Sequence, residues 1–306
     1  MKKILPFILL LVLLVSACGK QTTKTEETAS AKEKKSGTIT YQSENGPVEV
    51  PADPKRVVML AGFAGNVLDL GVNIVGADKW AKTSPRFAEG LKNAAEVSDE
   101  NLEKIMELNP DLIIGLSNMK NVDKLKKIAP VVTFTWGKQD YLNQHIEIGK
   151  LLNKEKEATA WVEDFKKRAE ASGEKIKAKI GDKATVSVIE NFDKQLYVFG
   201  NNWARGTEIL YQAMGLNMPE KVKADALKPG YFAISAEVLP QYAGDYVILS
   251  KYSTADSSFQ QTEAYKNIPA VKNNRVFEMD GNGASFSDPI TLEAQLKFFE
   301  ESFLGK

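Results

Sequence analysis

Residues 154–180 read KEKEATAWVEDFKKRAEASGEKIKAKI, and this stretch decides the fold because it lies near the middle of the 306-residue chain. Its apolar side chains recur at helical spacing, and most of the remaining positions are Lys or Glu. The residues in phase are Ala158, Trp161, Val162, Phe165, Ala169, Gly173, Ile176 and Ile180. The pattern predicts one amphipathic helix of about 26 residues, roughly 39 Å long. A helix of that length between two halves would hold them at a nearly fixed separation.

On both sides of this predicted helix, short β-branched runs alternate with amphipathic stretches. Strands are expected at residues 57–61, 74–77, 112–116, 131–134, 185–190, 196–199, 246–250 and 275–279. Helices are expected at residues 65–70, 101–108, 122–128, 141–152, 207–214, 236–242 and 289–303. Strands that alternate with helices predict α/β layers with largely parallel sheets.

A weak internal repeat indicates that the two halves are related. In the first half, Glu103 is followed after seven residues by Asp111 and then by the apolar run LII. In the second half, Glu237 is followed after seven residues by Asp245 and then by YVI. Because the two matches fall at equivalent places, we expect duplicated lobes on either side of the helix.

The first 19 residues, MKKILPFILLLVLLVSACG, have the order of a secretory signal. Their apolar run of about a dozen residues is shorter than the roughly 20 that a transmembrane helix needs. Val15-Ser16-Ala17-Cys18 resembles a bacterial lipobox, and Cys18 is the only cysteine in the chain. Two acyl chains at this thiol would anchor the protein stably, so we expect it at the extracellular face of the cell membrane. The alternative is an ordinary secretory signal with a leftover thiol.

These features divide the chain into five parts. Residues 20–38 hold no aromatic residue and no Leu, Ile or Val, a composition typical of a flexible tether. The expected parts are a lipoprotein signal peptide at 1–17, the tether at 18–38, an N-terminal lobe at 39–153, the linker helix at 154–180 and a C-terminal lobe at 181–306.

Composition excludes several classes of function. Forty basic and forty acidic residues leave no net charge, and no basic stripe indicates nucleic acid binding. His145 is the only histidine, too few for an ordinary zinc or manganese site, so we expect no metal ligands. We expect His145 to be a surface residue or a residue with satisfied hydrogen bonds within a helix. The chain has no Gly-x-Ser-x-Gly, Gly-x-Gly-x-x-Gly or Walker-type motif. We therefore expect no catalysis and no cofactor, although a metal could arrive already wrapped in a chelator.

The sharpest local pattern is YVFGNNWARGT at residues 197–207. Trp203 and Arg205 fall in a polar loop after an expected strand, where α/β sheets usually place ligands. Other aromatic residues also fall in expected strand-to-helix loops, and about half of these are expected in the core. They are Phe63, Trp80, Trp136, Tyr231, Phe232, Tyr252, Phe259 and Phe286.

Several motifs together resemble the iron-siderophore binding lipoproteins of bacterial ABC importers. These are DPKRVVML, LDLGVNIVGA, NLEKIMELNPDLIIG, YAGDYVILS, YKNIPAVKNNRVFEMD and SDPITLE, in the family's order over essentially the whole mature chain. LYVFGNNWARGTEILYQAMGL resembles the ferric hydroxamate (ferrichrome and ferrioxamine type) members from Gram-positive bacteria. The resemblance implies two Rossmann-like α/β lobes joined by a single long rigid helix, the helical-backbone periplasmic-binding-protein fold, with the ligand in the cleft between the lobes.

The resemblance also assigns roles to residues. Trp203, Arg205 and Tyr197 match siderophore contacts in the C-terminal lobe, and Trp136 matches an aromatic residue of the N-terminal wall. Further candidates for the cleft are Phe259, Phe286, Phe63 and Trp80. Glu103 and Glu237 match the two carboxylates that dock on the permease subunits. We expect the partners to be the ferric siderophore, the permease and the membrane, and the protein itself to be a monomer.

The charges of the residues favour hydroxamates. Three hydroxamates around Fe(III) form a neutral core, which requires apolar walls and one fork of donors such as a guanidinium. A triply charged catecholate complex or a citrate complex would need more cations, for which Arg86, Lys79 and Lys251 are candidates. Haem is less favoured because only one histidine is present. A surface-anchored hydrolase and an adhesive lipoprotein are alternatives from other classes.

Overall fold

The computed structural model describes residues 37–305. The expected signal peptide, the lipidation site Cys18 and the tether as far as residue 36 lie outside the described residues. Within the described part, no helix is both long enough and apolar enough to cross a membrane.

The N-terminal lobe is built on a five-stranded parallel sheet with the strand order β5-β4-β3-β6-β7. Its strands are β3 (Val57–Met59), β4 (Ile74–Ala77), β5 (Ala95–Glu96), β6 (Leu112–Leu116) and β7 (Val131–Phe134). Its helices are α1 (Ala64–Asp69), α2 (Lys79–Thr83), α3 (Leu102–Glu107), α4 (Val122–Leu125) and α5 (Tyr141–Leu151). An antiparallel hairpin of β1 (Thr38–Ser43) and β2 (Gly46–Pro51) precedes the sheet.

The C-terminal lobe repeats this strand order as β10-β9-β8-β11-β12. Its strands are β8 (Val186–Phe192), β9 (Gln195–Phe199), β10 (Tyr231–Ile234), β11 (Tyr246–Lys251) and β12 (Val276–Asp280). Its helices are η1 (Glu208–Ala213), α7 (Glu220–Ala226), η2 (Leu239–Gln241), η3 (Ser258–Gln261), α8 (Glu263–Lys266), α9 (Pro269–Lys272), α10 (Gly281–Ala284) and α11 (Pro289–Leu304). The lobes differ in one respect, because β9 is antiparallel to both of its neighbours.

The repeat noted in the sequence has the same structural role in both lobes. Asp111 stands before β6 and accepts hydrogen bonds from the backbone N–H groups of Lys55 and Arg56, which lead into β3. Asp245 stands before β11 and accepts from the backbone N–H and the hydroxyl of Thr185, which leads into β8. Each aspartate therefore fixes the start of the two central strands of its sheet.

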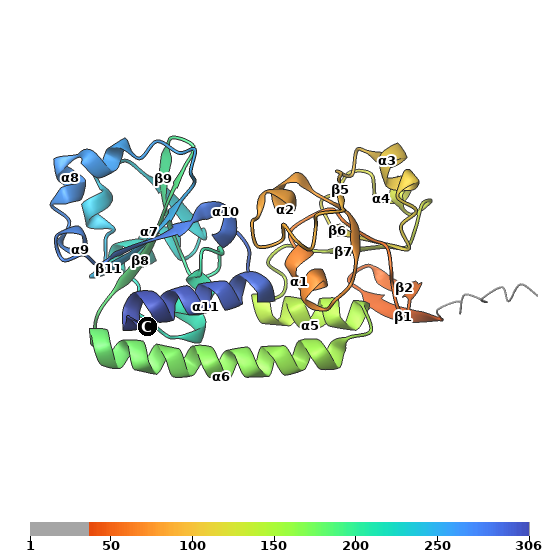
Figure 1. Cartoon of the computed structure of the whole chain (residues 1–306), viewed down its shortest axis with the longest axis horizontal. Helices are drawn as coiled ribbons and strands as arrows, with labels where there is room; N and C mark the ends of the chain where they lie inside the picture. Colours follow the sequence, from red (N-terminus) through yellow and green to blue (C-terminus); the bar gives the residue numbers. More distant parts are fainter. Residues whose placement is uncertain (1–36, 306) are drawn as a thin grey trace, which may run out of the picture. The chain divides into compact units, whose positions relative to one another are not determined.

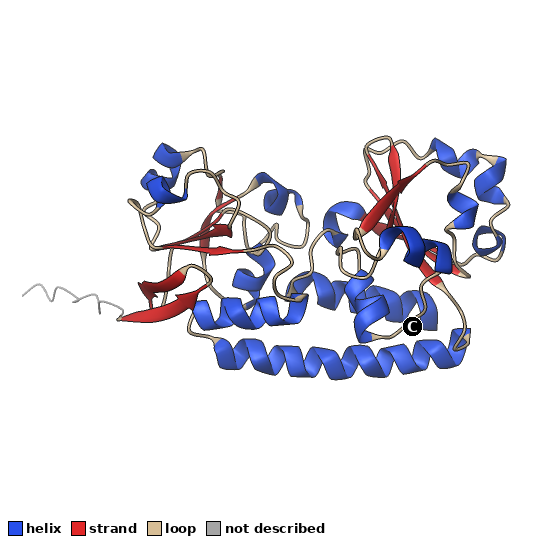
Figure 2. Ribbon diagram, turned by 180° about the vertical axis from the view of Figure 1, so that it is seen from behind, coloured by secondary structure: helices blue, strands red, loops and turns tan. Residues whose placement is uncertain are grey.

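One helix, α6 (Glu155–Ile180), runs beneath both lobes (Figures 1 and 2). Its apolar face contributes Ala158 to the core of the N-terminal lobe and Phe165, Ala169 and Ile176 to the core of the C-terminal lobe. It packs against α5 in the N-terminal lobe and against α11 and η1 in the C-terminal lobe. The predicted fold class, two α/β lobes joined by a single long helix, is confirmed.

Some element boundaries differ from those expected. The expected helix at 236–242 is a turn followed by the short 3₁₀ helix η2, and the expected helix at 207–214 is the π-helix η1. The hairpin β1–β2 and the strands β5 and β10 were not expected. The hairpin begins at Thr38, the last residue assigned to the tether.

Candidate functional site

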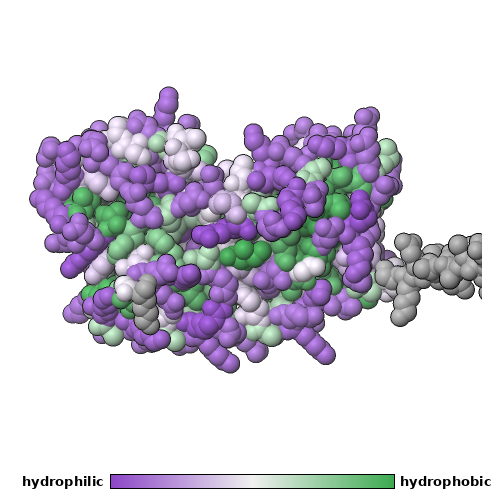
Figure 3. Space-filling view, viewed as in Figure 1, coloured by the Kyte–Doolittle hydropathy of each residue, from purple (hydrophilic) through white to green (hydrophobic). Residues whose placement is uncertain are grey.

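A cavity of about 430 Å³ lies between the lobes and is lined by both of them. The space-filling view shows a hollow between the two lobes (Figure 3). The N-terminal lobe contributes loops after β3 and β7 and the start of α5. The C-terminal lobe contributes the loop after β9, the start of η1 and Ser287. Because the loops come from the carboxyl ends of strands, the position is the one that α/β sheets favour for ligands.

The N-terminal wall of this cavity is aromatic. Phe63 and Trp136 stack with ring centroids 6.3 Å apart. The ring of Phe134 contacts that of Phe63 edge-on, with centroids 5.6 Å apart. Phe63 is buried, whereas Trp136 is 58% exposed and therefore presents its ring to the cavity. Gly62 has φ +57°, a left-handed conformation, and the indole lies 3.5 Å from where its Cβ would be.

The C-terminal wall is formed by Trp203 with a second group of rings beside it. Tyr231 lies 5.2 Å from the ring of Trp203 and 5.9 Å from that of Tyr197. Gly230 has φ +91°, and a Cβ at this position would come within 2.7 Å of the indole. Trp203 lines the cavity, whereas Tyr197 is not among the lining residues and reaches them only through Tyr231.

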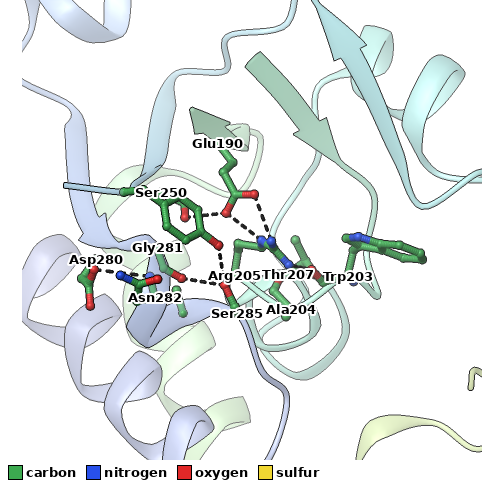
Figure 4. A network of polar contacts seen from close by, with 12 residues as sticks. Glu190, Trp203, Ala204, Arg205, Thr207, Ser250, Asp280, Gly281, Asn282 and Ser285 are labelled. Carbon is green, nitrogen blue, oxygen red and sulfur yellow. Dashed lines mark hydrogen bonds and ion pairs between the residues drawn. The ribbon is translucent and has the colours of Figure 1, made fainter. Parts of the chain in front are cut away.

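Arg205 is held in place by a buried carboxylate (Figure 4). Its Nε and Nη2 donate to the two carboxylate oxygens of Glu190 at 2.8 and 2.9 Å, and Nη1 donates to the carbonyl of Trp203 at 3.2 Å. Ser250 also donates to Glu190, at 2.8 Å. A guanidinium has five N–H groups, so two take no part in these three bonds. Arg205 is not among the residues that line the cavity. The fork expected from the sequence is thus present, but its charge is balanced.

The loop that carries Trp203 and Arg205 has an unusual backbone. Ala204, Arg205 and Gly206 have φ values of +58°, +54° and +79° in succession. A left-handed conformation costs a non-glycine residue roughly 1–2 kcal/mol. Such strain persists where surrounding contacts impose it, and it is frequent at binding sites.

Besides Tyr197, three predicted aromatic contacts lie outside the cavity wall. Trp80 is 41% exposed but does not line the cavity. It packs near Phe192 and Tyr252 of the C-terminal lobe and near Phe286, which is itself buried. Phe259 is buried edge-on against Tyr265 in the core of the C-terminal lobe. The structure therefore does not bring Phe259 to the cleft, because its loop folds back over the sheet instead of lining the cavity.

The cavity is poor in positive charge. Among its described lining residues the ionisable carboxylates are Asp140 and Glu208, and no Lys or Arg is present. Of the cations considered for a charged chelate, Lys251 binds Glu278 and Gln260, and Arg86 approaches only the carbonyl of Gly283. The remaining polar groups are mostly amides, which the sequence analysis did not identify: Asn66, Gln139, Gln144, Asn201, Asn202 and Gln212.

His145 is structural. It is fully buried on α5, its Nδ1 lies 3.1 Å from Oδ1 of Asn66, and its ring packs edge-on against Trp161. Burial lowers its pKa to about 4, so the ring is neutral at neutral pH. No group of three metal-ligating side chains occurs among residues 37–305.

Glu103 and Glu237 are both exposed. Glu103 lies in the first turn of α3, and Glu237 in the turn before η2. Each stands eight residues before the aspartate that anchors its sheet, so the two carboxylates occupy corresponding places in the two lobes.

A two-lobed α/β fold with a ligand-sized cavity between the lobes is typical of a substrate-binding protein. This chain belongs to the periplasmic binding protein family, whose sequence model matches residues 60–282. It is 38% identical to the iron(3+)-hydroxamate-binding protein FhuD of Bacillus subtilis (strain 168), over 97% of this chain and 95% of that protein. It is 37% identical to the iron(3+)-hydroxamate-binding protein YxeB of the same organism, over 98% and 95% of the two chains.

Solved structures agree with the sequence relatives. The FhuD protein from S. pseudintermedius superposes with a TM-score of 0.79 at 36% identity, covering 88% of this chain and 99% of that one. FhuD2 from Staphylococcus aureus with bound ferrioxamine B superposes with a TM-score of 0.78 at 33% identity, covering 82% and 99%.

Proposed function

We propose that this chain is a receptor that binds ferric hydroxamate siderophores between its lobes and delivers them to the permease of an ABC importer. It acts as a carrier and not as an enzyme. Cys18 would carry the lipid that holds it at the extracellular face of the membrane, and the receptor would work as a monomer.

One observation carries the proposal: the described cavity wall combines aromatic rings from both lobes with amides and contains no Lys or Arg. A ferric tris-hydroxamate is uncharged at its centre, so rings can cover it without a large desolvation cost. An anionic chelate would instead face the carboxylate of Asp140 without a compensating cation in this wall. The two relatives named for iron(3+)-hydroxamate binding support the same ligand class.

Fluorescence titration tests the proposal. Trp136 and Trp203 face the cavity, so a bound Fe(III) complex should quench their emission. We expect saturable quenching by ferrioxamine B and ferrichrome and little response to ferric citrate or a ferric catecholate. The gallium complexes control for absorbance by iron, because they should compete for the site without quenching. Stronger binding of the anionic chelates would contradict the proposal.

A further inference from the structure

Glu208 is a buried carboxyl group in the wall of the ligand cavity, with only 4% of its surface exposed. It begins η1, directly after the loop that carries Trp203 and Arg205. Its Oε1 accepts hydrogen bonds from the backbone N–H of Ala204 and from the hydroxyl of Ser287, both at 2.9 Å. Glu208 thus connects the strained loop to the segment before α11.

The second oxygen of Glu208, Oε2, shares the hydroxyl of Thr207 with the backbone carbonyl of Ala204. Oγ1 of Thr207 lies 2.8 Å from the carbonyl oxygen of Ala204 and 3.0 Å from Oε2 of Glu208. The hydroxyl has one proton for these two oxygens, and the Ala204 carbonyl also accepts from the backbone N–H of Thr207 at 3.0 Å. Oγ1 then accepts from the backbone N–H of Trp203 at 3.0 Å and has a lone pair left. Both short contacts of the hydroxyl become hydrogen bonds when it donates to Ala204 at 2.8 Å and Oε2 of Glu208 carries a proton that it donates to Thr207.

The surroundings favour this neutral form. Burial raises the pKa of Glu208, against the opposing effect of the hydrogen bonds that it accepts. Arg205 is the cation of the same loop, but Glu190 neutralises it. Tyr141 faces Glu208 from α5, and its own pKa is raised by burial and then by Glu208. Asp140 of the cavity wall and the buried Asp288, which follows Ser287, are further acids and add no positive charge nearby.

We propose that protonated Glu208 is a positioning residue that holds the loop at residues 203–206 in its ligand-binding conformation, so that ligand affinity falls when Glu208 ionises. The proposal rests on the proposed function and names a regulation of the same site. When Oε2 loses its proton to solvent, it becomes a second acceptor that competes with the Ala204 carbonyl for the Thr207 hydroxyl. The left-handed run from Ala204 to Gly206 then loses one of the contacts that impose it, and Trp203 and Arg205 lose their fixed positions.

The test compares the wild type, Glu208→Gln and the control Glu163→Gln in a titration with ferrioxamine B from about pH 5 to about pH 9. A glutamine side chain can accept through its oxygen and donate through its amide, so it mimics the protonated acid at every pH. We expect the wild-type Kd to rise by about tenfold or more across this range. Glu208→Gln should bind as tightly as the wild type at low pH and show no such rise. Glu163 is exposed on α6, and its variant should follow the wild type.

An equal pH dependence in the wild type and Glu208→Gln would overturn the proposal, as would weak binding by Glu208→Gln at every pH. An infrared measurement without ligand separates this proposal from the proposed function. The wild-type spectrum minus that of Glu208→Gln should contain the C=O band of a protonated carboxylic acid near neutral pH. Absence of the band would overturn the proposal. If the carboxylic acid band is present but the protein does not bind ferrioxamine B, the result would support the protonation of Glu208 and contradict the proposed function.

Discussion

Arg205 and Glu190 form an ion pair that is nearly withdrawn from solvent, with side-chain exposures of 14% and 3%. Removing one partner of such a pair leaves an uncompensated buried charge, and this typically costs about 3–5 kcal/mol. We propose two roles for the guanidinium: it stabilises the lobe through Glu190, and its two remaining N–H groups bind the ligand. Alanine substitution alone would mix the two effects.

The two roles can be separated with a double variant. We expect Arg205→Ala to lower the free energy of unfolding by about 3–5 kcal/mol, and Arg205→Ala/Glu190→Gln to recover most of that loss, as measured by urea denaturation. Both should bind ferrioxamine B more weakly by about 1.5–3 kcal/mol, the range for a hydrogen bond to a charged group. Wild-type affinity in the stable double variant would remove Arg205 from the binding site.

At the scale of single residues, the sequence identified the rings but not all of their positions. Trp136, Trp203 and Phe63 line the cavity because they directly follow strands, and that position can be recognised from periodicity. Phe259 also follows a strand, but its loop folds over the core, and this depends on tertiary packing. Asn66 and Gln144 could not be found, because an amide inside an amphipathic helix gives no signal of which way it faces.

At the scale of secondary structure, buried parallel strands were predicted best. The apolar runs of β4, β6 and β7 have the expected ends, since strands covered on both faces read as continuous apolar segments. The hairpin strands β1 and β2 are half polar and gave no such run. The strand β10 is the apolar run YFAI, but its first three residues are exposed at the sheet edge, and the sequence analysis placed Tyr231 and Phe232 in a loop. The π-helical form of η1 has no sequence signature.

The linker helix α6 contains Gly173, and its close contact explains why glycine occurs inside a helix. A Cβ at this position would lie 2.5 Å from the carbonyl oxygen of Met214, at the end of η1. We expect Gly173→Ala to destabilise the protein by about 1–2 kcal/mol, because overpacking costs about 1–3 kcal/mol and exceeds the gain in helix propensity of about 1 kcal/mol. Urea denaturation measures the change, and Glu170→Ala on the exposed face should stay within about 0.5 kcal/mol of the wild type. A stabilised Gly173→Ala would show that α6 and η1 pack less closely.

At the scale of the whole described molecule, Asp288 lies where the two lobes meet. It caps α11 by accepting from the backbone N–H and hydroxyl of Thr291, and its carboxylate lies against Gly65 of α1, where a Cβ would clash. Burial raises its pKa from 3.8 to about 6. A raised carboxyl pKa means that the folded state favours the protonated form, so the stability from Asp288 is complete below about pH 4 and is lost as the pH rises through about 6.

The variant Asp288→Asn tests this dependence, since asparagine keeps the cap and cannot ionise. Relative to the wild type, we expect its free energy of unfolding to increase between about pH 4 and about pH 6 and then to stay constant, with a total gain of about 2–3 kcal/mol. Urea denaturation at several pH values measures the difference. His145, with its pKa lowered by burial, changes both proteins equally and cancels. If the difference in the free energy of unfolding between Asp288→Asn and the wild type does not depend on pH, then Asp288 does not have a raised pKa.

Docking through Glu103 and Glu237 would involve the whole molecule, because each lobe carries one of the two carboxylates and α6 sets the spacing between the lobes. Both are exposed and stand at corresponding places in the two lobes. If they dock on the permease, Glu103→Gln/Glu237→Gln should bind ferrioxamine B normally but fail to support iron uptake in cells that lack their own receptor. Either single variant should retain part of the uptake. Glu89→Gln/Glu263→Gln is the matched control, since these glutamates are also exposed, one in each lobe, and lie outside the repeat. Normal uptake by the first double variant would contradict docking through these residues, whereas loss of uptake in both double variants would indicate a general effect of surface charge.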